Sequence, residues 1–189
     1  AIGCILGGHG ITAWGDTTDE CEANSLWIIN TAADYIEANG KAEPFGSVRP
    51  GFEALSKDER LAKAAALAPT LRAIASHDKA MVGNFTDADV VLDFLASSNA
   101  PALAELGTSC PDHFLRTKVK PMLLDLPATA SVEESIARLN ELHEAYRADY
   151  AGYYERNATL DSPAIRGADP LIILIPGVGM FSYGANKQT

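Results

Sequence analysis

Two similar glycine turns, each joining two short apolar runs, constrain the fold more than any other feature of this 189-residue sequence. In the first, the apolar run 2–6 ends in Gly7-Gly8-His9-Gly10, and strand-favouring residues resume at 11–14. This pattern is typical of a strand, a glycine turn and a second strand. The stretch 175–184 repeats it, with three glycines and one aromatic residue in register and Val178 in the place of His9. Either one strand-turn-strand unit is used twice, or the matching glycines are a coincidence in a chain with 15 of them.

Capping boxes predict three long helices between these turns. Thr17 with Glu20 opens a helix that should end at Asn39-Gly40, and Ser56 with Glu59 opens one that should run to about Ser76. Pro69 should kink or split that second helix, because proline lacks an amide donor. The third and longest helix should begin after Ser131, which has Glu134 three residues on, and run to about Arg156 with an apolar stripe at helical spacing.

Shorter elements fill the rest of the chain. Thr86 is expected to cap a helix whose inward face carries Val90, Val91, Phe94 and Leu95, and a brief helix is expected over 101–106. Strands are expected at 81–85, 122–126 and 171–175, and the segment 108–120 is polar and basic. The alternation of helices and strands predicts an α/β fold, with helices layered on a mixed or antiparallel sheet.

The longest irregular stretch suggests a domain boundary. Residues 41–55 contain two prolines and two glycines and show no periodicity, so we interpret them as a linker. The predicted organisation is therefore a small unit at 1–40 and a larger α/β unit at 56–189. Because the chain starts inside an apolar run and without Met, we also expect it to be a fragment of a longer protein.

Charge and cysteine content exclude several classes of protein. The net charge of −10 disfavours binding to nucleic acid or to an anionic membrane surface, since both would be repelled. No apolar run is long enough for a transmembrane helix, and the first residues do not show a basic n-region followed by an apolar h-region. Cys4, Cys21 and Cys110 are odd in number and far apart, which gives neither a zinc pattern nor a disulfide framework and favours the cytoplasm.

Histidines are the first candidates for chemistry. His9 lies between Gly8 and Gly10, where the missing side chains would let an ion or a ligand approach the imidazole; the alternative is an ordinary turn histidine. His143 lies on the apolar stripe of its helix and is expected to be a core histidine with its hydrogen bonds satisfied. His77 follows a helix end, where a cation interacts well with the helix dipole.

A basic group after residue 110 is the second candidate. Arg116 and Lys118 could bind a sugar phosphate, and His113 could donate a proton or act as a ligand. The alternative is a solvated basic loop in which Asp112 anchors Arg116.

The first glycine turn and the helix after it resemble a known family. Residues 3–15, followed by Glu20, Ala23 and Leu26 on a capped helix, look like the last conserved motif of the class II aldolase/adducin family. The stretches 107–118 and 175–181 resemble the middle of bifunctional proteins that join a rhamnulose-1-phosphate aldolase-like region to a short-chain dehydrogenase. The resemblance covers nearly the whole chain and implies a class II aldolase-like fragment. In it, residues 1–40 would be the C-terminal part of a class II aldolase-like domain, and residues 56–189 an α/β extension specific to the subgroup, with a degenerate aldolase-like repeat as one interpretation of that extension.

The resemblance also implies a reaction and a cofactor. The family binds zinc through three histidines and uses a glutamate as acid/base, and only the third histidine can be carried over, onto His9, because the chain has no His-x-His. The implied reaction is zinc-dependent cleavage of a ketose 1-phosphate by a homo-oligomer, in which this fragment alone would be inactive. NAD would belong to the dehydrogenase region, since no G-x-G-x-x-G opens a helix here. The alternatives are a non-catalytic adducin-like module for oligomerisation or docking, and a related sugar-phosphate epimerase.

Overall fold

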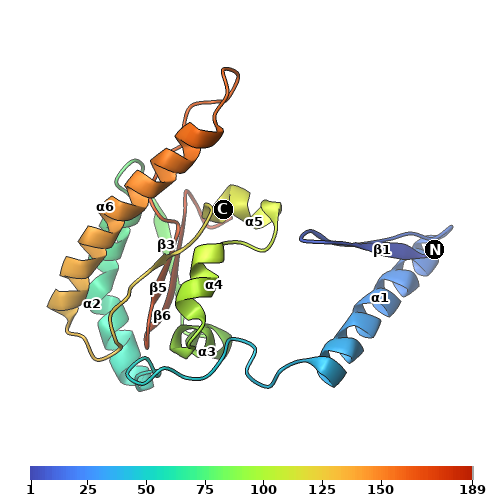
Figure 1. Cartoon of the computed structure of the whole chain (residues 1–189), viewed down its shortest axis with the longest axis horizontal. Helices are drawn as coiled ribbons and strands as arrows, with labels where there is room; N and C mark the ends of the chain where they lie inside the picture. The colour runs from blue at the N-terminus through green and yellow to red at the C-terminus, as the bar shows by residue number, and fades with distance from the viewer. Residues whose placement is uncertain (189) are drawn as a thin grey trace. The chain divides into compact units, whose positions relative to one another are not determined.

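The computed structural model describes residues 1–188, which form two compact units. The first unit contains residues 1–44 with 109–113, and the second contains residues 45–108 and the chain from 114 onward. Helices and a mixed sheet make up the α/β architecture that the sequence predicts (Figure 1). No helix in the described part of the chain is both long enough and apolar enough to span a bilayer.

The first unit is a hairpin and one helix. Strands β1 (Gly3–Leu6) and β2 (Gly10–Ala13) pair antiparallel, and α1 (Thr18–Asn39) follows them. The Thr17 side chain caps α1 by accepting a hydrogen bond from the Glu20 amide at 3.2 Å, as the sequence predicts. Ile28 of α1 lies against Gly3, where a Cβ would come within 2.5 Å of the Ile28 side chain. This close approach explains why a glycine opens β1.

The second unit is built on a four-stranded mixed sheet. Its strand order is β3 (Val82–Thr86), β6 (Gly179–Gly184), β5 (Ile172–Ile175) and β4 (Met122–Leu123). The β3–β6 and β6–β5 pairs are antiparallel, and the β5–β4 pair is parallel. The two central strands therefore form a hairpin that has a partner strand on each side.

Four helices of the second unit accompany this sheet: α2 (Lys57–Ala75), α3 (Asp89–Ala96), α4 (Ala100–Leu106) and α6 (Val132–Asn157). A fifth helix, α5 (Pro111–Thr117), has residues in both units. Helices α2 and α6 lie side by side and pack against the sheet, and α3 and α4 lie on its other side (Figure 1). The capping boxes at Ser56 and Ser131 are both present. Fully buried Leu67 and Leu71 of α2 and Leu139 of α6 meet the central strands in the core, and this burial is the main stabilising contribution.

The two glycine turns have the same backbone conformation. Gly8 and Gly177, the equivalent residues of the two turns, have φ of 69° and 70°. The next equivalent pair, Gly10 and Gly179, have φ of 150° and 147°. Side chains rarely adopt these positive φ values, which accounts for the glycines at both places in each turn.

Hydrogen bonds in the two hairpins also match. In the turns, the His9 amide donates to the Leu6 carbonyl and the Val178 amide to the Ile175 carbonyl, each at 3.1 Å. At the open end of each hairpin, the backbone amide of the aromatic residue donates to the carbonyl of the residue just before the first strand. The Trp14 amide donates to the Ile2 carbonyl at 3.1 Å, and the Tyr183 amide donates to the Leu171 carbonyl at 2.8 Å. The two hairpins therefore have the same backbone conformation and register, as the repeat hypothesis requires.

The surroundings of the two hairpins differ. Residues of β5 and β6 are buried between β3 and β4, and Val178 at the turn is fully buried. In the first hairpin, Ile5 and Trp14 are exposed, because β1 and β2 have only each other as partners among the described strands.

Two helix predictions need correction. Pro69 does not split α2, which is one helix, because exposed Pro69 removes one hydrogen bond while the buried face of the helix stays packed. The alternative, a kink at Pro69, stays a prediction. Thr86 does not cap α3: the N-cap residue is Ala88, which makes no side-chain cap bond, and Thr86 Oγ1 accepts from the Ala88 amide at 3.4 Å. Because α3 starts later, Val90 is exposed and Leu92 is buried in its place.

Two other segments differ in extent. The polar segment 108–120, interpreted as a possible loop, contains the helix α5, and the strand predicted at 122–126 has only two residues. The boundaries predicted at 40 and 55 stay predictions.

Candidate functional site

The structure places the predicted site residues in different surroundings. His9 lies in the exposed turn between β1 and β2. His113 and Arg116 are exposed on α5, whereas Lys118, just beyond the end of α5, is half-buried. The side chain of Asp112 lies outside what the structure describes.

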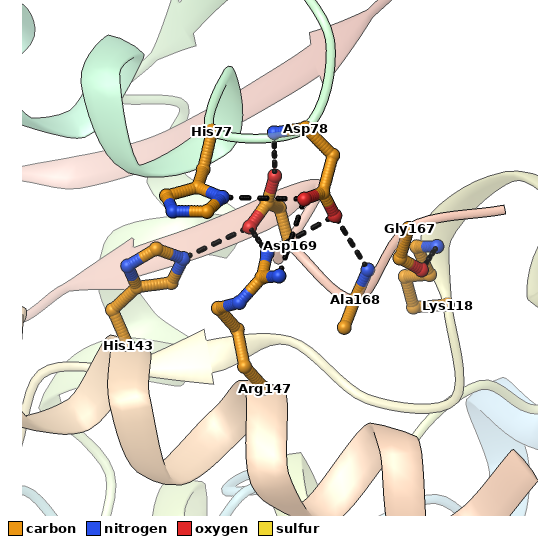
Figure 2. A network of polar contacts seen from close by, with 8 residues as sticks. All are labelled: His77, Asp78, Lys118, His143, Arg147, Gly167, Ala168 and Asp169. Carbon is orange, nitrogen blue, oxygen red and sulfur yellow. Dashed lines mark hydrogen bonds and ion pairs between the residues drawn. The ribbon is translucent and has the colours of Figure 1, made fainter. Parts of the chain in front are cut away.

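Lys118 belongs to a polar cluster in the second unit that the sequence does not reveal. The cluster, called here the Asp169 cluster, brings together the end of α2 and the loop after it, one face of α6, and the residues before β5 (Figure 2). Its members are His77, Asp78, Lys118, His143, Arg147 and Asp169.

Asp169 is the buried centre of this cluster, with 5% of its surface exposed. Its carboxylate accepts hydrogen bonds from the Asp78 amide at 2.9 Å, from His143 Nε2 at 3.0 Å and from the Arg147 guanidinium. A buried carboxylate is stable only with such partners, so each of them compensates part of the cost of burying its charge.

Asp78 forms the second carboxylate of the cluster. Arg147 donates to both of its oxygens, at 3.0 and 3.1 Å, in the two-pronged geometry that suits guanidinium and carboxylate. The Ala168 amide donates at 3.1 Å and His77 Nδ1 at 3.2 Å (Figure 2). The Arg147 hydrogen bonds hold the pKa of Asp78 well below its ordinary value, and the Asp78 hydrogen bonds raise the pKa of Arg147.

Backbone strain is concentrated beside these carboxylates. Lys118 has a φ of 67°, and no other non-glycine residue in the described part of the chain has a positive φ. Such a conformation costs roughly 1–2 kcal/mol for a residue with a side chain. Gly167 has a φ of 95°, and a Cβ there would lie 2.9 Å from Asp78 Oδ2. Strain of this kind is often found at functional sites.

The side chain of Lys118 connects its own strained backbone to Gly167. Its Nζ donates to the Gly167 carbonyl at 2.8 Å and lies 4.5 Å from the centre of the Tyr150 ring, within the range of a cation–π contact. Burial lowers the pKa of Lys118, although the charges of Asp169 and Asp78 act in the opposite direction. The neighbours of the Lys118 ammonium group therefore do not fully compensate the free energy that the group loses when it is removed from water.

Three residues of the cluster have the spacing of metal ligands, but their carboxylates are not free to coordinate a metal ion. One ligand atom each from His77, Asp78 and Asp169 lie within 4.8 Å of one another. Arg147 already binds both carboxylates, however, so a metal ion would have to displace a guanidinium from them. Zinc sites use ligands that are free to coordinate. These residues fit the arginine better than they fit zinc.

The two remaining histidine predictions can now be compared with the structure. His143 is a mostly buried histidine whose Nε2 is hydrogen-bonded to Asp169, which confirms the expectation of a satisfied core histidine. His77 follows the end of α2 and contacts Asp78. Arg147 lies 69 residues from Asp78, and Asp169 lies 91 residues from it, so no local sequence motif could reveal the cluster.

Comparison with known proteins gives two matches. Residues 62–189 match the family model described as aldolase class II, second domain. The uncharacterized oxidoreductase YuxG of Bacillus subtilis (strain 168) is 35% identical over 178 residues, which cover 93% of this chain and 25% of that protein. The chain thus spans about a quarter of the length of this curated relative. No solved structure matches the chain.

Proposed function

The chain belongs to the class II aldolase family, as residues 62–189 match its second domain, and from this we propose that it is part of a zinc-dependent aldolase that cleaves a ketose 1-phosphate. We infer a substrate of the rhamnulose-1-phosphate type and a parent protein in which a short-chain dehydrogenase follows. The name of the longer relative, an oxidoreductase, is compatible with such a fusion. NAD would then bind only to the dehydrogenase region.

The open turn around His9 carries this proposal. A Cβ added at Gly7 or Gly10 would meet no atom within 4 Å. At Gly177, in the equivalent turn of the second unit, a Cβ would lie 2.2 Å from the Ala128 side chain. At Gly8, the equivalent of Gly177, a Cβ would meet only the Ser109 carbonyl oxygen, at 3.7 Å. The second turn is therefore tightly packed around Val178, whereas the first turn is loosely packed and carries a histidine, a residue type that can bind a metal. We propose His9 as a zinc ligand on this basis.

His9 supplies one of the three protein ligands that a catalytic zinc usually has. Within the described residues, the group with metal-ligand spacing does not include His9. The other ligands and the acid/base glutamate would come from polypeptide outside these 189 residues. When bound, zinc would polarise the ketone oxygen of the substrate. The part of this chain would be to hold the imidazole at the turn of the β1–β2 hairpin.

We further propose that His113, Arg116 and Lys118 contribute to binding the substrate phosphate, in a cytoplasmic homo-oligomer. Arg116 is exposed, and an exposed arginine side chain loses entropy when it binds. Lys118 is positioned in advance by Gly167 and Tyr150. Of the three residues, Lys118 is therefore expected to matter most.

Cleavage of a ketose 1-phosphate by a longer polypeptide that contains this chain tests the proposal. His9→Ala should lower kcat by more than about 100-fold, because the zinc would lose a ligand. Lys41→Ala, an exposed change in the same unit, is the control and should leave kcat unchanged. Equal activity of wild type and His9→Ala would reject the zinc role. Product analysis separates the epimerase, which would give an isomeric sugar phosphate and no aldehyde.

A docking module is the second candidate, because α1 has an exposed apolar surface. The exposed side chains on it are Leu26, Trp27, Ile29, Tyr35 and Ile36. Apolar surface of this extent on a helix is typical of an interface. A parent protein that forms oligomers but cleaves no sugar phosphate, and that dissociates on Trp27→Ser, would favour this function over the aldolase.

A further inference from the structure

We propose that a small cavity beside Lys118 binds an oxyanion of the phosphate type, held by Lys118, Lys79 and Arg166. The cavity has a volume of about 80 Å³ and is lined by these three residues together with Gly167, Asp78 and Asp169. It lies entirely in the second unit.

The size of the cavity suits one small polar group. A water molecule takes about 30 Å³ in the liquid, so the cavity holds roughly two or three waters or a single tetrahedral oxyanion. A larger ligand would have to place its phosphate in the cavity and keep the rest of the molecule outside. The cavity therefore fits a phosphate monoester or inorganic phosphate.

The charges around the cavity favour an anion. Lys79, Lys118 and Arg166 line it, while both carboxylates in its wall are already hydrogen-bonded to Arg147. This local excess of cations occurs in a chain whose net charge is −10. A divalent cation would be repelled by the lysines and the arginine, whereas an oxyanion would gain charge-assisted hydrogen bonds.

Lys118 is built into this place by the fold. A Cβ at Gly107 would lie 2.0 Å from the Val119 carbonyl oxygen, so the chain just after Lys118 passes directly over a glycine. This passage and the bond from Lys118 Nζ to the Gly167 carbonyl hold the strained backbone in position. Burial lowers the pKa of Lys118 despite two nearby aspartates, so an added anion would supply the missing compensation.

Phosphate binding to the full 189-residue chain tests this inference. The probes are inorganic phosphate and a ketose 1-phosphate, and the binding is followed by NMR of ¹³C-labelled lysine side chains and by calorimetry. We expect saturable binding that shifts the Lys118 signal. Lys118→Met should weaken binding by at least about tenfold, which corresponds to the loss of one charge-assisted contact.

Lys120→Met is the matched control, because Lys120 is two residues away but pairs with Glu105 and Asp149. It should leave phosphate affinity within about twofold of wild type. Since Lys118→Met could perturb the fold, Arg166→Ala, on an exposed residue, gives a second test and should weaken binding by about threefold. No saturable binding, or equal affinity in wild type, Lys118→Met and Arg166→Ala, would overturn the inference.

The two sources of the oxyanion give different results. A ketose 1-phosphate that binds at least about tenfold more tightly than inorganic phosphate identifies the substrate as the ligand, and that identification rests on the proposed aldolase function. Equal affinities identify free phosphate. Because binding is measured without turnover, an inactive parent protein would reject the aldolase and leave the oxyanion site standing.

Discussion

Asp169 accepts hydrogen bonds from a backbone amide, a histidine and an arginine, and these three groups come from separate parts of the second unit. Its carboxylate therefore joins the loop after α2, the face of α6 and the start of β5. Asp125 is a useful comparison, because it also pairs with an arginine, Arg138, but on the exposed surface. The two carboxylates differ in burial, because Asp169 is buried and Asp125 is exposed.

Asp169→Ala should lower the free energy of unfolding by roughly 3–5 kcal/mol, because Arg147 and the Asp78 amide would lose a buried partner. Asp125→Ala should lower it by no more than about 1 kcal/mol. Urea unfolding of both variants measures the two values. A cost for Asp169→Ala as small as that of Asp125→Ala would show that the cluster does not stabilise the fold.

Asp78 predicts a pH dependence of stability. Its pKa is lower in the folded chain than in the unfolded chain, so its contribution is fully present above the ordinary pKa near 4 and is lost as the pH falls through the folded value. Wild type should therefore lose stability below about pH 4 more steeply than Asp78→Asn. Urea midpoints measured between pH 7 and pH 2.5 check this. Parallel curves for the two proteins would contradict it.

The sequence predicted some candidate site residues and not others. His9 and Lys118 could be selected from the sequence because each has informative neighbours along the chain. Asp78, Arg147 and Asp169 could not, because only the packing of α6 against the start of β5 and the end of α2 brings them together. The roles of His9, His113, Arg116 and Lys118 stay predictions.

At the level of elements, two hairpins with one backbone conformation sit in different surroundings. Matching glycines and apolar flanks were enough to predict both hairpins, and the capping boxes were enough to predict α2 and α6. The start of α3 was missed because Thr86 bonds the Ala88 amide from within β3 and does not cap the helix. α5 was missed because a short polar helix has no apolar stripe to reveal it.

The paired turns allow a matched mutation experiment. Gly8→Ala should cost about 1 kcal/mol, since it imposes a positive φ on alanine but meets only the Ser109 carbonyl oxygen, at 3.7 Å. Gly177→Ala imposes the same φ and also a clash with Ala128, and should cost roughly 2–5 kcal/mol. Thermal unfolding followed by circular dichroism compares the two variants. Equal costs would mean that the second turn is not packed as the structure shows.

At the level of the whole molecule, the chain combines a small unit with an exposed hairpin and a larger unit with the same hairpin buried in a four-stranded sheet. The division into 1–40, a linker at 41–55 and 56–189 remains our proposal for its domains. The second hairpin shows that this motif can be buried between two partner strands. We expect β1 and β2 to gain comparable partners from the polypeptide that would complete the proposed zinc site.

The 189-residue chain by itself should bind zinc only weakly, because on our proposal it would contribute one ligand, His9, and a catalytic zinc usually has three protein ligands. Calorimetric titration with zinc should give a dissociation constant in the micromolar range or weaker, on the order of that expected for one or two imidazoles. A tight one-to-one complex that survives His9→Ala would show that the site has been placed wrongly.

The zinc content of the longer polypeptide, purified without added metal, tests the central claim most directly. We predict about one zinc per chain in wild type, a loss of most of that zinc in His9→Ala, and no loss in His77→Ala, whose imidazole lies beside the arginine-bound Asp78. Zinc retained in His9→Ala but lost in His77→Ala would contradict the account, because it would place the metal in the Asp169 cluster and not at the open glycine turn.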